Sequence, residues 1–127
     1  VERIVNLGAY ASPRTFVPTY NGLALLGGFY RITAAHARVR GVFSNTSPTT
    51  VYRGAGRPEV VYACERLVDI AARELGMDPV ALRRRNAIER TDGPVNGFGA
   101  TFGDADFRTA FERALTLVDH GGMQARR

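Results

Sequence analysis

The feature that most constrains the fold is an extended run that passes through a glycine-containing turn directly into a helix. Residues 35–44 are predicted to form a strand, because Val39 and Phe43 alternate with Arg38 and Arg40. After a polar segment and the turn, Pro58 and Glu59 suit the first turn of a helix. Apolar residues then recur at helical spacings, at Val60, Cys64, Leu67, Val68, Ala71 and Leu75. These spacings predict an amphipathic helix that ends at Gly76.

The first part of the chain, residues 1–57, is predicted to be rich in strands. Residues 4–10 and 29–33 carry β-branched and aromatic side chains, which favours a strand in each segment. Residues 21–28 are short, apolar and rich in glycine, so they are consistent with either a helical turn or a buried loop.

The second part, residues 58–127, is predicted to be rich in helices. Asp78 followed by proline is typical of a capped helix start, and Asp104 or Asp106 caps a further helix that a glycine pair ends. Between these helices, residues 91–103 form a long connector whose phenylalanines favour burial. A few strands followed by two to three helices indicate one α+β unit over the whole chain.

The turn before the amphipathic helix has the chemistry of an anion site. Two glycines without Cβ atoms allow a bound group to approach the backbone. Peptide N–H groups at a helix start and two forked guanidinium groups suit an oxyanion. An ordinary tight turn with two solvated arginines is the alternative, and the pattern alone does not separate the two. The candidate cofactor-binding residues are Tyr52, Arg53, Gly54, Ala55, Gly56 and Arg57.

Composition narrows the classes of partner. All seventeen basic residues are arginines, and the net charge is +5. They are dispersed except at residues 83–85, which we expect on a solvated helix side or against a neighbouring domain. Without a nucleic-acid motif, we expect no nucleic-acid partner. No apolar run approaches the ~20 residues of a membrane span, so we also expect no membrane partner and a cytoplasmic location.

Catalytic and metal-binding sets of residues are not evident in the sequence. Cys64 lies on the apolar helix stripe and is predicted to be a core residue. The two histidines, His36 and His120, have no ligand at metal-binding spacing, and His120 suits the last turn of the third helix. We therefore assign no catalytic residue and no metal ligand.

Several segments in order resemble the large, molybdenum-binding subunit of the xanthine dehydrogenase, aldehyde oxidase and aerobic carbon monoxide dehydrogenase family. The combination covers nearly the whole chain and is highly specific, above all Tyr-Arg-Gly-Ala-Gly-Arg-Pro-Glu followed by Glu-Arg-Leu-Val. The matching segments are residues 6–10, 28–32, 44–59, 65–68, 72–79, 82–86 and 102–104.

The resemblance implies a fragment of a molybdopterin-binding domain from an oxidoreductase of aldehydes, heteroaromatics or related substrates. In that family the turn lies beside the molybdenum centre, and the backbone amide at the position of Arg53 lies near the ligands of the metal. The implied cofactor is molybdopterin with molybdenum, in the cytosine dinucleotide form. The implied partners are the remainder of the large subunit and FAD-binding and iron–sulfur subunits or domains.

The sequence departs from the family pattern at two positions of the turn. Ala55 stands where xanthine-oxidising relatives often have an aromatic residue, and Gly54 stands where carbon monoxide dehydrogenases have a cysteine that bridges molybdenum to copper. The family's Gly-Gly-Gly-Phe-Gly and Gly-x-Gly-Glu segments, the second of which bears the general base, do not occur. We therefore expect the isolated chain neither to hold the cofactor tightly nor to turn over. A stand-alone anion- or nucleotide-binding domain and a purely structural α+β unit are the alternatives.

Overall fold

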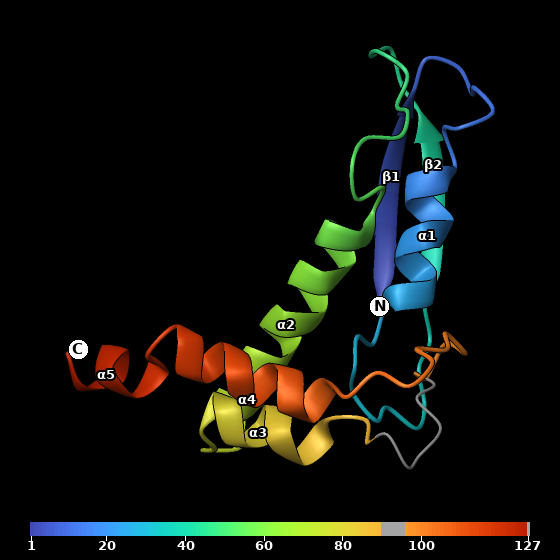
Figure 1. Ribbon diagram of the computed structural model, residues 1–127. Helices are drawn as coiled ribbons and strands as arrows, with labels where there is room; N and C mark the ends of the chain where they lie inside the picture. The colour runs from blue at the N-terminus through green and yellow to red at the C-terminus, as the bar shows by residue number, and fades with distance from the viewer. Residues whose placement is uncertain (90–95, 127) are drawn as a thin grey trace.

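The computed structural model describes residues 1–89 and 96–126 (Figure 1). Strands and helices alternate at first, and helices alone follow, so the α+β class is confirmed. The start of the connector predicted at residues 91–103 lies outside the described residues. The elements of the described part are β1 (Glu2–Gly8), α1 (Val17–Leu25), β2 (Arg38–Phe43), α2 (Arg57–Glu74), α3 (Pro79–Asn86), α4 (Phe107–Leu117) and α5 (His120–Ala125).

The two strands form a parallel pair that α1 and α2 cover on one face. Glu2 pairs with Arg38, and the register continues to Gly8 and Phe43 with one irregularity near the end of β1. Side chains alternate between the two faces. Leu7 points to the covered face and is buried, whereas Ile4 on the open face is 60% exposed.

The helix α2 runs from the strand pair to the group of helices at the other end of the molecule (Figure 1). Val60 and Cys64 are buried, as the apolar stripe predicts. Leu67 is 53% exposed, however, and Ala72 is buried in its place. The reason is that Val60, near the start of α2, lies against Gly22 of α1, whereas Glu65 and Asp69 further along pair with α3, so the buried side of the helix changes along its length.

Residues 29–33 do not form the strand that we predicted. Tyr30 makes a single antiparallel bridge with Ala87, and no other residue of this segment pairs in a ladder within the described part of the chain. The segment instead supplies an aromatic contact, because the ring of Phe29 stacks on Tyr30 and on Phe107 at centroid separations of 4.5 and 5.5 Å. This cluster attaches α4 to the centre of the molecule.

An ion-pair network fastens α3 to α2. Arg83 is only 14% exposed at its side chain and lies 2.8 Å from both Glu65 and Asp69. The hydroxyl of Tyr30 donates to the same Glu65 carboxylate at 2.8 Å. Our prediction of solvent or a neighbouring domain for the arginine run is therefore wrong at Arg83, whose partners are distant in the sequence. Arg84 instead bonds Glu112 of α4, at 2.8 Å.

The helix starts follow the sequence, but the last helix end does not. Asp78 accepts a hydrogen bond from the amide of Ala81 at 2.8 Å, and Asp106 caps α4 in the same way. The glycine pair does not end α4, because Asp119 adopts a left-handed conformation and caps a further helix. His120 accordingly begins α5 and does not lie in the last turn of α4.

Candidate anion-binding turn

The turn between β2 and α2 has three consecutive residues in the left-handed region. The φ angles are +95° at Gly54, +41° at Ala55 and +89° at Gly56. Two short-range hydrogen bonds close the turn: the amide of Ala55 donates to Tyr52 at 2.9 Å, and that of Arg57 donates to Gly54 at 3.0 Å. Glycine adopts such angles at little steric cost, which explains two of the three positions.

The helix α1 determines where this turn lies. A Cβ on Gly56 would be 1.9 Å from the carbonyl oxygen of Pro18, in the first turn of α1. A Cβ on Gly22, one helical turn further along, would be 3.0 Å from the carbonyl oxygen of Gly56. The backbones of the turn and of α1 therefore meet directly, with no side chain between them.

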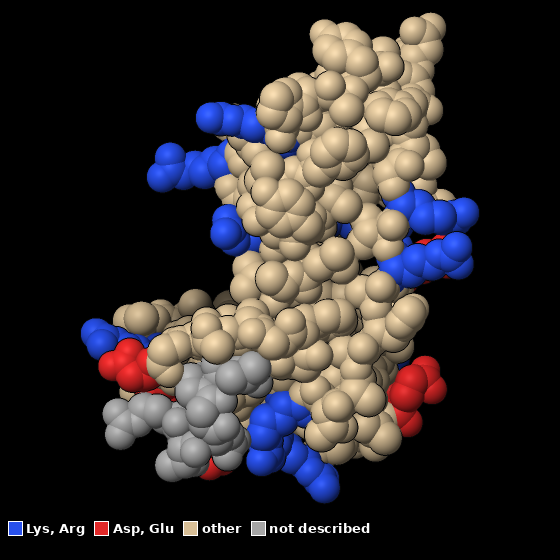
Figure 2. All heavy atoms as spheres, turned by 90° about the vertical axis from the view of Figure 1, so that its right-hand side faces the viewer, with Lys and Arg blue, Asp and Glu red and all other residues tan. Residues whose placement is uncertain are grey.

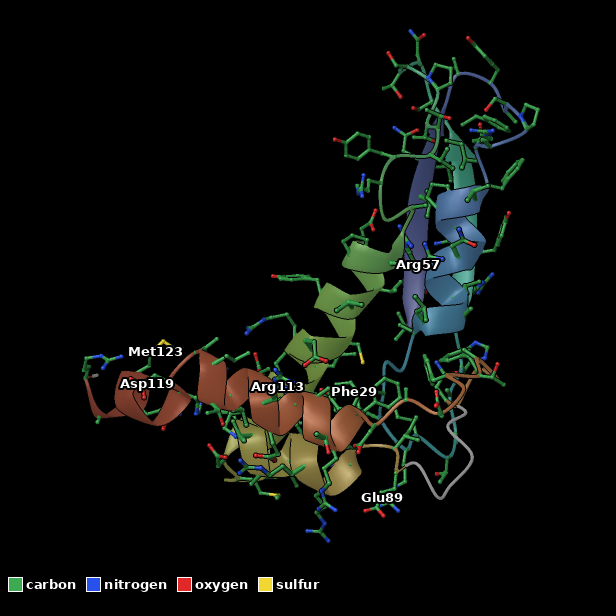
Figure 3. The ribbon with its side chains drawn as sticks, in the orientation of Figure 1. Phe29, Arg57, Glu89, Arg113, Asp119 and Met123 are labelled. Carbon is green, nitrogen blue, oxygen red and sulfur yellow. The ribbon has the colours of Figure 1, made fainter. Side chains whose placement is uncertain are left out.

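Several donors of the turn have no acceptor within the described part of the chain. These are the amide N–H groups of Arg53, Gly54 and Gly56. The guanidinium groups of Arg53 and Arg57 likewise form no ion pair with any described residue, and Figure 3 labels Arg57 where α2 begins, beside β1 and α1. Backbone and side-chain donors thus converge on one short segment next to a helix start, where the helix dipole also favours an anion.

A hollow on the surface brings together four of the six candidate residues. Tyr52, which is 88% exposed, lines it with Arg53, Ala55 and Gly56. Gly54 and Arg57 do not line this hollow. Residues outside the candidate set complete its wall, namely Pro18, Thr50, Pro58 and Glu59. Pro18 comes from α1, so the local motif carries no signal for it, whereas Thr50 lies just before the turn.

Other chemistry is limited in the described residues. No group of three or more His, Cys, Asp or Glu side chains lies close enough to hold a metal ion there. Burial raises the pKa of the Cys64 thiol, in agreement with a core residue. Arginines occur in separate places on the face shown in Figure 2 and do not form one continuous stripe.

None of the helices in the described part of the chain combines the length and the hydropathy that crossing a bilayer requires.

Comparison with protein families gives a match over most of the chain. Residues 1–87 match the family described as molybdopterin cofactor-binding domain. This range includes both strands, the turn, α2 and α3.

Curated relatives are much longer than this chain. The carbon monoxide dehydrogenase large chain of Hydrogenophaga pseudoflava is 36% identical over 104 residues, which are 80% of this chain and 13% of the relative. Subunit gamma of the 6-hydroxypseudooxynicotine dehydrogenase complex of Paenarthrobacter nicotinovorans is 35% identical over 89 residues, which are 70% of this chain and 11% of the relative. The chain therefore spans about an eighth of the length of these relatives.

Solved structures of related proteins superpose on nearly the whole chain. Quinoline 2-oxidoreductase from Pseudomonas putida 86 superposes with a TM-score of 0.88 at 32% identity, over 98% of this chain and 16% of the other. The Cu,Mo-containing carbon monoxide dehydrogenase superposes with a TM-score of 0.81 at 27% identity, again over 98% and 16%. The fold described above is thus a portion of these larger chains.

Proposed function

Because this chain belongs to the molybdopterin cofactor-binding domain family of xanthine dehydrogenase, aldehyde oxidoreductase and carbon monoxide dehydrogenase large chains, we propose that its turn forms one wall of a molybdenum-cofactor site. The observation that carries this proposal is the set of unaccepted N–H groups at Arg53, Gly54 and Gly56. A buried donor without an acceptor is costly, which applies to Gly56, while the partly exposed Gly54 and the exposed Arg53 can donate to a ligand or to solvent. The turn therefore has the donors that a phosphorylated, oxyanionic cofactor accepts from.

The residues of the turn fit such a group in three ways. Arg53 offers its backbone amide as a donor. Gly54 leaves its backbone accessible because it has no Cβ and is partly exposed, whereas the missing Cβ of Gly56 allows the contact with Pro18. Arg53 and Arg57 add fixed positive charge that forms no ion pair with the described residues. When bound, the molybdenum cofactor supplies the two-electron redox chemistry of hydroxylation, and the turn orients and partly encloses it.

Two positions of the turn, Ala55 and Gly54, restrict the substrate class that we propose. Ala55 presents only a methyl group to the hollow, so it offers no aromatic ring on which a purine would stack. Gly54 offers no thiol to hold copper beside molybdenum. We therefore propose aldehydes or heteroaromatic compounds other than purines, and not carbon monoxide, as the substrates of the assembled enzyme.

The cofactor form and the partners are extensions of the same proposal. We propose the cytosine dinucleotide form of molybdopterin, the remainder of a large subunit, and FAD-binding and iron–sulfur partners that remove the electrons. Relatives named as a large chain and as subunit gamma of a dehydrogenase complex support this assembly. The segment that bears the general base in the family does not occur in the sequence, so we propose that the chain alone does not turn over.

The test is a double variant in the native assembly that carries this chain. Replacement of Arg53 and Arg57 by alanine should reduce the molybdenum content measured by elemental mass spectrometry. The matched control replaces Arg73 and Arg113, two exposed arginines away from the turn, and removes the same charge. Equal molybdenum content in both double variants would reject a role of the turn in holding the cofactor. Loss of inorganic phosphate binding without loss of molybdenum would instead favour a general anion site.

A further inference from the structure

The outer edge of β2 is unpaired in the described part of the chain. The amide of Arg38 donates to the carbonyl of Val1 at 2.9 Å, so the N–H and C=O groups of Arg38 point toward β1. In a parallel ladder, successive residues of a strand direct these groups to alternate sides. Those of Val39, Gly41 and Phe43 therefore point away from β1, on the side of the pair away from α2 (Figure 1). None of them has a hydrogen-bond partner among the described residues.

The edge and the face beside it are open to contact. Gly41 is exposed, and the side chain of Phe43 is 60% exposed. On the open face, Ile4 and Val42 are exposed as well. A row of unpaired N–H and C=O groups is a template for a further strand, and parallel sheets are normally covered on both faces. The pair thus has the features of a larger sheet of which it forms one part.

The charges beside the edge restrict what can pair there. Arg38 and Arg40 are both exposed on the open face. Glu2 of β1 lies 3.3 Å from Arg40, whereas Arg38 forms no ion pair with any described residue. Opposite charges on neighbouring strands stabilise a sheet, and like charges destabilise it. A strand beside β2 should therefore carry an acidic side chain next to these arginines and an apolar one next to Val42.

A second copy of this chain fits the edge poorly. Two identical chains associate most often about a two-fold axis, which would pair β2 with itself in the antiparallel direction. The arginines of the two copies would then lie near one another, which is unfavourable. Larger relatives offer another source, because quinoline 2-oxidoreductase superposes on 98% of this chain with only 16% of its own.

We propose that an extended segment from the remainder of the large subunit adds to β2 as a third strand. Its backbone bonds the outward groups of Val39, Gly41 and Phe43, and an acidic side chain of the segment lies beside Arg38 and Arg40. Main-chain hydrogen bonds supply the affinity in strand addition, and alternate side chains supply the specificity. The identity of the partner rests on the proposed function, which assigns this chain to a large subunit.

The experiment is residue-resolved hydrogen–deuterium exchange on the native assembly that carries this chain. The amides of Arg40 and Val42 point toward β1 and are the internal standard. We expect the amides of Gly41 and Phe43 to exchange as slowly as this standard, because a third strand accepts from them. Exchange of Gly41 and Phe43 at the rate of an unstructured peptide, with the standard protected, would overturn the proposal.

Two variants at position 43 isolate the contribution of one outward N–H group. Phe43→Pro removes the ring and the N–H, whereas Phe43→Ala removes the ring alone. We expect the amide of Gly41 to exchange about five- to tenfold faster in the assembly with Phe43→Pro than in that with Phe43→Ala, since one hydrogen bond to the added strand is lost. Equal rates in the two variants would overturn the proposal. Continued protection of Arg40 and Val42 shows that the pairing with β1 is intact.

Cross-linking from a photoreactive phenylalanine analogue at position 43 identifies the added strand. We expect cross-links to an extended, acidic segment of the same large subunit outside residues 1–127. Cross-links to residues 1–127 of a second copy would overturn the proposal. Molybdenum content, measured on the same sample, separates this inference from the cofactor site. Protected edge amides without molybdenum would support the strand and reject the cofactor, and unprotected edge amides with molybdenum would do the reverse.

Discussion

Gly56 lies so close to Pro18 that a Cβ on Gly56 would sit 1.9 Å from the carbonyl oxygen of Pro18. This contact joins the turn before α2 to the first turn of α1. The N–H groups of the turn therefore keep their direction only while α1 remains against them.

Replacement of Gly56 by alanine tests this dependence. The new methyl group must displace α1, and the residue must also keep a φ of +89°. We expect the free energy of unfolding to fall by about 2–5 kcal/mol, from overpacking together with the cost of a left-handed non-glycine residue. Denaturant titration followed by circular dichroism measures the change.

The matched control is Gly76→Ala. Gly76 also has a positive φ, +62°, but a Cβ there meets no atom within 4 Å. The free energy of unfolding should therefore fall by only about 1–2 kcal/mol in Gly76→Ala, which is the conformational cost alone. Equal losses in the two variants would show that α1 does not constrain the turn.

Replacement of Arg83 by methionine tests the network between α2 and α3. The Nη2 atom of Arg83 lies 2.8 Å from a carboxylate oxygen of Glu65 and 2.8 Å from one of Asp69. The variant leaves both carboxylates without this shared partner. We expect the free energy of unfolding to fall by about 1–3 kcal/mol. This is less than for a completely buried pair, because both carboxylates are partly exposed. Thermal and denaturant unfolding measure it.

The control for this network is Arg84→Met. Arg84 and Glu112 form a bidentate pair, but both side chains are nearly half exposed. Solvent screens such pairs, so the loss should be smaller than for Arg83→Met. A larger loss from Arg84→Met would contradict the importance that we give to the Arg83 network.

Acid pH should weaken the same network. The hydrogen bond from Arg83 lowers the pKa of Asp69 below its ordinary value. The folded chain thus binds fewer protons there than the unfolded chain, and the contribution is complete above the unfolded pKa of about 3.9 and is lost as pH falls through the folded value. Stability measured from pH 6 down to pH 2 should therefore decline less steeply in Asp69→Asn than in the unsubstituted chain. Parallel declines would contradict this contribution of Asp69. Glu112, whose pKa Arg84 also lowers, titrates in both proteins and so cancels in the comparison.

Local signals predicted the helix starts and the candidate turn, because each rests on neighbouring residues. Asp78 caps α3 by bonding an amide three positions ahead, and the glycines at positions 54 and 56 adopt the left-handed angles that such a turn needs. The motifs that resemble molybdenum-binding large subunits are likewise local, and the family match confirms them. The cofactor role of each turn residue remains a prediction.

Long-range contacts explain what the sequence did not predict. The close approach of Pro18 to Gly56 joins segments that no motif connects. The sequence therefore does not predict that α1 packs against the turn. The pairing of Arg83 with Glu65 depends on how α3 folds back against α2. Tyr30 has β-forming neighbours, but within the described residues its segment makes one bridge, to Ala87, and forms no strand.

The most direct test of the cofactor proposal is the molybdenum content of the native complex captured through this chain, determined by elemental mass spectrometry. Our account predicts stoichiometric molybdenum, together with a cytosine dinucleotide and iron-containing partners. A native complex that contains no molybdenum would contradict it, and the turn from Tyr52 to Arg57 would then have kept its shape without the cofactor.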